Sequence, residues 1–192
     1  MKGNTDVFGE AIFTRRLQLR RVREADLGLL LAWSNDPLAF GNYLTPEHST
    51  ATQLKEQLAA GCLWSRHNKT LLIEKRDPLR PIGTIRYWLK QARQGCAVIC
   101  VKIAAADERG HGFGTEAQKF LIIQLFDQVG VEQIEMVTDI DNVAQQRCLN
   151  KLGFVAEKSL TYDDHQVTRT GHLYCLDREA YQRTPVYRYH YE

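Results

Sequence analysis

Apolar residues recur along the chain at two spacings, one typical of helices and one typical of strands. Near-alternation over 15–22 predicts a strand, and helical spacing follows it in 23–36, before Pro37, and in 49–61. Three strand-like runs come next, then a long apolar helix at 112–130. The rest of the chain reads as strand, helix, strand and strand. The expected ranges after residue 61 are 70–76, 81–89, 96–105, 112–130, 131–139, 142–153, 154–162 and 167–177.

The order of these elements decides the fold class. An antiparallel first half, with short turns between 70 and 105, meets a second half in which strands alternate with helices. We therefore predict an α+β fold, in which helices cover one mixed, mostly antiparallel sheet. We expect one domain over residues 1–192. We expect the N-terminal segment 1–14 to be loose, and the tail 184–192 either to pack on a partner subunit or to be loose as well.

Composition narrows the class of protein. With a net charge of +2 and 44% hydrophobic residues, the chain is ordinary for a globular domain and gives no reason to expect nucleic acid or membranes as partners. No run reaches the 18 or so uncharged apolar residues of a membrane span. Five scattered cysteines fit reduced thiols in the cytoplasm, and no histidine pair completes a metal site. We predict a cytoplasmic protein without a metal.

A glycine-rich corner carries the clearest chemistry. Residues 109–114 read R-x-x-G-x-G and lie between the strand-like run 96–105 and the helix that follows. Glycine lets backbone approach a ligand closely, and the first turn of a helix has free N–H donors and a partial positive charge. Together these features predict a phosphate site.

Two other interpretations of this corner are open from the motif alone. A P-loop requires lysine after the last glycine, where this chain has Thr115 and then Glu116, whose carboxylate would repel phosphate. Residues 112–117 do match the dinucleotide motif G-x-G-x-x-A, with Asp139 at the place of a ribose-binding acid. However, seven residues separate the glycines from their strand, and too few strand–helix–strand units follow.

The motif and its surroundings resemble the GNAT N-acetyltransferases, whose acetyl-CoA motif is [QR]-x-x-G-x-[GA]. Residues 142–154 resemble the N-x-x-x-x-R-x-L-x-K-L-G-F element of the Rim-type branch, which includes ribosomal-protein N-terminal acetyltransferases. Residues 16–37 and the hairpin 73–88, which includes Gly83, are similar to that branch as well. The resemblance covers residues 15 to about 180. It implies a GNAT fold with six to seven strands, about four helices, and a splay between the fourth and fifth strands.

The resemblance also implies acetyl-CoA as co-substrate. The loop would hold its diphosphate, the pantetheine arm would lie in the splay, and an N–H near 101–103 would polarise the thioester. Asn142 would cap the next helix or touch the cofactor, and Arg109 would add charge or position the loop. The implied contacts are Ile103, Ala104, Ala105, Arg109, Gly110, His111, Gly112, Phe113, Gly114, Thr115 and Asn142.

The customary acid and base of the family do not carry over. Its tyrosine, serine and glutamate positions hold Leu149, Gln145 and Ile99. Candidates from the chain itself are Glu74, Asp139 and Tyr162, together with Asp163, Asp164 and His165 in the last turn. Transfer by positioning and a water relay is also open.

The implied reaction is direct acetyl transfer to a primary amine of a small molecule or a protein N-terminus, by a monomer or homodimer. The aromatics between Trp33 and Trp64 belong either to the acceptor wall or to the core. Two alternatives remain: a CoA-binding sensor or interaction protein without catalysis, and a dinucleotide-dependent oxidoreductase.

Overall fold

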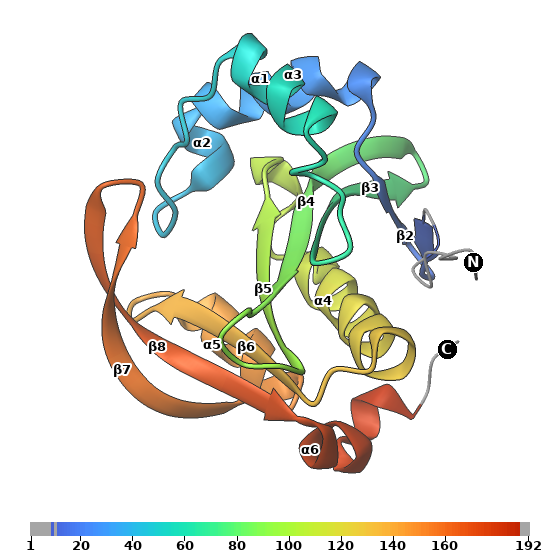
Figure 1. The fold of residues 1–192 in the computed structure, drawn as a ribbon, viewed down its shortest axis with the longest axis vertical. Coiled ribbons are helices and arrows are strands. Elements are labelled where there is room, and N and C mark those ends of the chain that lie inside the picture. Colours follow the sequence, from blue (N-terminus) through green and yellow to red (C-terminus); the bar gives the residue numbers. More distant parts are fainter. Residues whose placement is uncertain (1–8, 10, 189–192) are drawn as a thin grey trace.

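The computed structural model describes residue 9 and residues 11–188. Eight strands form one sheet in the order β1-β2-β3-β4-β5-β6-β8-β7, and Figure 1 shows helices on both of its faces. The strands are β1 (Ala11–Phe13), β2 (Leu17–Arg21), β3 (Asn68–Arg76), β4 (Leu79–Leu89), β5 (Cys96–Ile103), β6 (Gln133–Asp139), β7 (Val155–Asp164) and β8 (Val167–Asp177). The α+β prediction is confirmed. The sheet has eight strands rather than six or seven, because the sequence gives little sign of the three-residue β1.

Six α-helices lie between or after these strands, where the sequence predicted about four. They are α1 (Leu27–Asn35), α2 (Pro37–Phe40), α3 (Ala51–Ala59), α4 (Phe113–Gln124), α5 (Val143–Lys151) and α6 (Arg178–Arg183). A π-helical turn, Leu125–Val129, continues α4. The short helices α2 and α6 are the two that were not predicted. None of the described helices combines the length and apolar character that a membrane crossing requires.

The core lies between one face of the sheet and α4. Its strand side chains include Leu19, Leu71, Ile85 and Ile99, all at most 2% exposed. Helix α4 is apolar on most of its circumference because it packs against both β2 and β5. This packing holds the first turn of α4 beside the end of β5.

The expected splay lies between β5 and β6. These strands run parallel and pair only at their starts, from Cys96–Gln133 to Val98–Glu135, after which they separate. The rest of β5 and β6 forms the open V seen in Figure 1. Because β5–β6 is the one parallel pair among the described strands, the successive parallel units of a dinucleotide fold are missing. The oxidoreductase alternative is therefore wrong.

Both margins of the chain are partly packed. Residues 11–13 form β1, and Tyr187 is buried, with its hydroxyl donating to the carbonyl oxygen of Leu152 at 2.7 Å. Thr184 also donates to the carbonyl oxygen of Ala180, and Val186 packs against the core, so residues 184–188 belong to the packed domain. Residues 1–8, 10 and 189–192, which complete the segments expected at the margins, lie outside the described residues.

Candidate acetyl-CoA site

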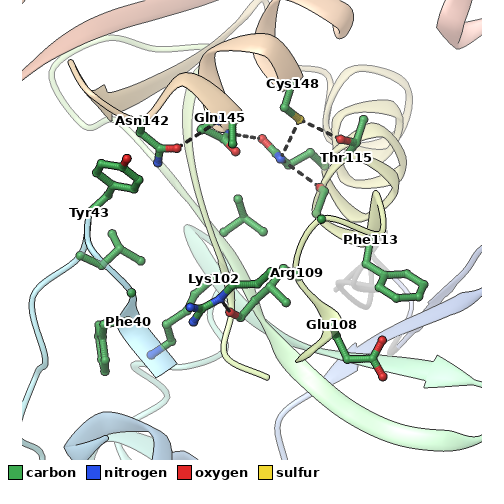
Figure 2. A pocket seen from close by; sticks show the side chains of 18 of the residues that line it. Phe40, Tyr43, Lys102, Glu108, Arg109, Phe113, Thr115, Asn142, Gln145 and Cys148 are labelled. Carbon is green, nitrogen blue, oxygen red and sulfur yellow. Dashed lines mark hydrogen bonds between the residues drawn. The ribbon is translucent and has the colours of Figure 1, made fainter. Parts of the chain in front are cut away.

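A pocket of about 500 Å³ opens where β5, the glycine loop, α4 and α5 meet. Figure 2 shows its lining side chains pointing inward from these elements and from the segment after α2. Most of the predicted cofactor contacts line this pocket. They are Ile103, Arg109, Gly110, Gly112, Phe113, Gly114, Thr115 and Asn142. The structure thus brings together two motifs that are about 30 residues apart in the sequence.

Free donors line the mouth of this pocket. Glycines 110 and 112 have φ of +78° and +81°, which L side chains rarely adopt, and Gly112 is the N-cap of α4. Within the described part of the chain, no backbone N–H of residues 110–115 donates a hydrogen bond to protein. The positive end of α4 and these amides form a site suited to a diphosphate.

Glu116, in the first turn of α4, does not face the phosphate site. Its carboxylate accepts from the Thr14 hydroxyl at 2.5 Å, the Arg16 amide at 3.0 Å and the Arg16 side chain at 2.6 Å. Arg16 also donates to the carbonyl oxygen of His111. The turn before β2 therefore neutralises Glu116 and holds the glycine loop from outside the pocket.

This contact makes stability depend on pH. Burial alone would raise the pKa of Glu116, but the hydrogen bonds from Thr14 and Arg16 outweigh it and lower the pKa below 4.5. A depressed carboxyl pKa stabilises the fold above the unfolded pKa, and the benefit is lost as pH falls through the folded value. Glu116→Gln should cost about 2 kcal/mol in urea unfolding at pH 7 and much less near pH 3. An equal cost at both pH values would contradict this assignment, and the exposed Glu179→Gln serves as control.

Arg109 positions the loop rather than facing phosphate. Its Nε donates to the carbonyl oxygen of Ile103 at 2.8 Å, and its Nη2 donates to those of Leu38 and Ala39 at 2.6 and 3.0 Å. Of the two roles that the sequence left open, the geometry favours positioning. Arg109 joins the end of β5, the glycine loop and α2, so it links the cofactor side of the molecule to the opposite wall.

Arg109→Leu should lower the free energy of unfolding by about 3 kcal/mol, because the part-buried hydrogen bonds to the carbonyls of Ile103 and Ala39 lose their charged donor. Acetyl-CoA affinity should also fall, since the loop loses its anchor. Urea unfolding and calorimetric titration measure the two effects. Arg183→Leu, which breaks an exposed pair with Glu179, is the matched control and should change neither by much. Unchanged stability in Arg109→Leu would refute the anchoring role.

Ala104, Ala105 and His111 do not line the pocket, unlike the other predicted contacts. The N–H groups of Ala104 and Ala105 both donate to the carbonyl oxygen of Ile82, so neither is free for a ligand. Ala104 is buried against Phe40 instead. The side chain of His111 and these two alanines therefore lie away from the pocket, because the chain turns away from the splay at residue 104.

The same geometry identifies which amides face the splay. Since the Ala104 N–H points toward β4, and alternate residues of a strand point the same way, Val101 and Ile103 present their N–H groups to the opposite edge. At that edge β6 has already separated from β5. Both residues line the pocket. These two N–H groups can therefore pair with an extended ligand lying in the gap.

Helix α5 supplies the far wall. The Asn142 side chain accepts from the Gln145 amide at 3.1 Å, so it is an N-cap and also lines the pocket. Gln145 donates to Gln118, and Gln118 donates to the carbonyl oxygen of Gly114 at 2.9 Å (Figure 2). Gln118 was not predicted, although a fully buried glutamine in an apolar helix is a signal for such a network.

A second pocket, of about 260 Å³, adjoins the first. It lies over the other face of the sheet, beneath α1 and α3 and beside the tip of the β7–β8 hairpin. Phe40, Leu44 and Lys102 line both pockets and so mark where they meet. Helix α2, which carries Phe40, was not predicted, and without it this boundary could not be located.

Three of the catalytic candidates, Glu74, Asp139 and Tyr162, lie outside both pockets. Glu74 is buried and held by Arg20 at 2.8 Å, and Asp139 lies 3.6 Å from Arg169. Burial and the nearby Asp139 and Asp164 raise the pKa of Tyr162, which keeps its phenol protonated. None of these three is placed to take a proton from a ligand in either pocket. Of the other candidates in the last turn, Asp164 and His165 line the second pocket, and Asp163 does not.

The positions where the family has its acid and base are structural here. Leu149 and Ile99 are buried in the core, and Gln145 is committed to Gln118. Among the described side chains, no three of His, Cys, Asp and Glu converge as a metal site requires.

Comparisons with known proteins identify the family of this chain. Residues 16–155 match the family model described as an acetyltransferase (GNAT) domain. A kanamycin resistance protein of Rhizobium radiobacter is 27% identical over 118 residues, which are 61% of this chain and 96% of that protein.

Two solved structures illustrate the similarity in fold. The ribosomal L7/L12 alpha-N-protein acetyltransferase RimL, in complex with coenzyme A, superposes with a TM-score of 0.75 and 15% identity, over 89% of this chain and 99% of that one. The aminoglycoside acetyltransferase AAC(6')-Ib, in complex with coenzyme A and kanamycin, superposes with a TM-score of 0.70 and 21% identity, over 88% of this chain and 98% of that one. The chain therefore belongs to the GNAT acetyltransferase family and is an N-acetyltransferase that uses acetyl-CoA.

Proposed function

We propose that acetyl-CoA occupies the larger pocket and that a primary amine reaches its thioester from the second pocket, so that both substrates are bound at once. The N–H groups of residues 110–115 hold the diphosphate. The pantetheine arm extends along the N–H groups of Val101 and Ile103. The observation that carries this proposal is the junction of the two pockets at the splayed end of β5.

The reaction needs one bond made and one broken. The neutral amine attacks the thioester carbon, a C–N bond forms, and the C–S bond breaks. An N–H proton leaves the acceptor, and the coenzyme A thiolate takes up a proton. An N–H on the splayed edge of β5 would stabilise the oxyanion. Of the six candidate bases, Asp164 and His165 line the acceptor pocket, and Asp164 is paired with Arg169. The rate therefore comes mainly from holding amine and thioester together, with proton transfer through water or through His165.

The charge of the second pocket bears on the acceptor. Its lining carries the acidic Glu47 and Asp164 and the basic Arg86 and Lys102, and Asp164 is already paired with Arg169 at 3.0 Å. Such a lining offers little attraction for a polycation. We therefore favour an acceptor with a single amine, either a small molecule or a protein N-terminus, over an aminoglycoside or a polyamine.

Release of the coenzyme A thiol from acetyl-CoA, followed with a thiol reagent, tests this proposal on an amine panel. The panel contains peptides with free N-termini, simple monoamines, spermidine and kanamycin. We expect product with a monoamine or a peptide, and weaker turnover of the two polycations. Fast acetylation of kanamycin or spermidine alone would overturn the acceptor class. Binding of acetyl-CoA without any product would favour the non-catalytic alternative.

A further inference from the structure

Lys102 has an unusual place among the lysines of this chain. It lies on β5 between Val101 and Ile103, and its side chain lines both pockets at their junction. Its Nζ lies 3.8 Å from the centre of the Phe40 ring, on the side of β5 opposite α4 (Figure 2). If acetyl-CoA binds as proposed above, this amine is on the strand that the thioester lies along.

The surroundings of Lys102 favour its neutral form more than those of other lysines. Lys75 lies 2.8 Å from Glu108, and Lys90 is paired with Glu135. For Lys102, the described residues include no carboxylate within ion-pair distance. Its charged form is supported by the Phe40 ring and, from farther away, by Glu47.

Burial supports the same conclusion. It lowers the pKa of Lys102 below 10.5, and Arg86 lowers it further, while Glu47 and Cys100 act in the opposite direction. Asp164 and His165 also face this pocket, and Asp164 is neutralised by Arg169. A larger fraction of Lys102 is therefore unprotonated at neutral pH than of a lysine side chain free in water.

We propose that Lys102 accepts the acetyl group from bound acetyl-CoA when the second pocket holds no other amine. This inference rests on the proposed function. The neutral Nζ attacks the thioester carbon, the N–C bond forms and the C–S bond breaks. The proton released from Nζ balances the one taken up by the coenzyme A thiolate. The product is an uncharged Nε-acetyl-lysine that fills the junction between the pockets and blocks the acceptor's access.

The test is to incubate the full chain with acetyl-CoA and no added amine, and to map acetyl-lysine by mass spectrometry of peptides. We expect one acetyl group at Lys102, formed on the order of tenfold or more faster than at Lys55, because bound reactants are already in place. The rate should rise with pH as Lys102 loses its proton. Lys102→Arg should remove this modification, while acetyl groups should form on Lys55 at the same rate as in the unmodified chain.

Two controls separate the possible results. If Lys102 is still acetylated in the Gly112→Val/Gly114→Val double variant, the reaction does not need the bound cofactor. If Lys102 is acetylated no faster than Lys55, the reaction is adventitious. Either result would overturn the inference. An unmodified Lys102 in a protein that binds acetyl-CoA by calorimetry would overturn it too, while leaving the proposed function intact. If acetyl-CoA does not bind at all, both fail.

A second readout does not depend on the cofactor. Trace labelling with acetic anhydride at a series of pH values reports the protonation of each lysine. Lys102 should reach half of its maximal reactivity at a lower pH than the lysine of a short unstructured peptide labelled in the same mixture. A higher midpoint for Lys102 would remove the chemical basis of the inference.

Discussion

Replacing Gly112 and Gly114 together by valine is expected to abolish acetyl-CoA binding, weakening affinity by about 100-fold or more. A Cβ at either position meets little protein: Arg16 at 3.6 Å from the one at Gly112 and Ile103 at 3.7 Å from the one at Gly114. The valine at position 114 would project beside Ile103, which lines the pocket, and the valine at position 112 would strain the positive φ on which the orientation of the loop amides depends. The fold should therefore survive a change that removes the ligand.

The matched control for this variant is Gly130→Val. Gly130 has φ of +78°, close to the +81° of Gly112, and a Cβ there meets nothing within 4 Å. Both substitutions carry a similar backbone strain, of about 1–2 kcal/mol. Only the double variant should lose binding in a calorimetric titration. Retained binding in a folded double variant, or equal loss in Gly130→Val, would contradict the role of the loop.

Replacing Gly83 by alanine is expected to cost about 3 kcal/mol of folding free energy. Gly83 pairs with Ile103 across β4 and β5, and an added Cβ would overlap the backbone carbonyl oxygen of Lys102. Because backbone cannot rotate away as a side chain can, the end of β5 must move. Acetyl-CoA binding should weaken as well, since that end of β5 forms the pocket wall.

Urea unfolding measures the effect of Gly83→Ala. Gly28→Ala is the control, and its expected effect on stability has the opposite sign. Gly28 lies within α1, and a Cβ there meets nothing within 4 Å. The control should raise stability by about 0.5–1 kcal/mol, because alanine loses less entropy than glycine in a helix. If Gly83→Ala unfolds at the urea concentration of the unmodified chain, the close approach of β4 and β5 is wrong.

Local signals were enough to locate most of the elements. The expected strand 167–177 coincides with β8, and the expected helix 49–61 contains α3, which Thr50 caps by accepting from the Gln53 amide. Such features depend on neighbouring residues, so a single sequence reveals them. Helix α2 was missed because its four residues lie among turn formers, although Asp36 caps it and Pro37 occupies its first position.

The phosphate loop could be predicted, but its supports could not. Glycines between a strand and a helix are a local pattern. Two of the three carbonyls that Arg109 contacts lie about 70 residues away in the chain, in the main chain of α2, and carry no sequence signal. Glu116 is a second example, because its charge was expected to repel phosphate. Its partner Arg16, which neutralises that charge, lies far away in the sequence.

Lys102 shows a third limit. In the sequence it is the one charged residue of the apolar run 96–105, and no neighbour in the chain indicates what its side chain contacts. The docking of α2 over the end of β5 buries it beside Phe40. Its chemistry therefore comes from tertiary packing. The candidates Glu74, Asp139 and Tyr162 line neither pocket, for a related reason. Their contacts depend on which residues lie beside them in the sheet, and the spacing along the sequence does not show those neighbours.

The central claim is that free backbone amides at the start of α4 hold the diphosphate of acetyl-CoA. A crystal structure of the chain with bound coenzyme A tests it most directly. The account predicts diphosphate oxygens within hydrogen-bond distance of N–H groups from residues 110–115. A diphosphate bound elsewhere, with these amides left empty in a fully occupied complex, would contradict it.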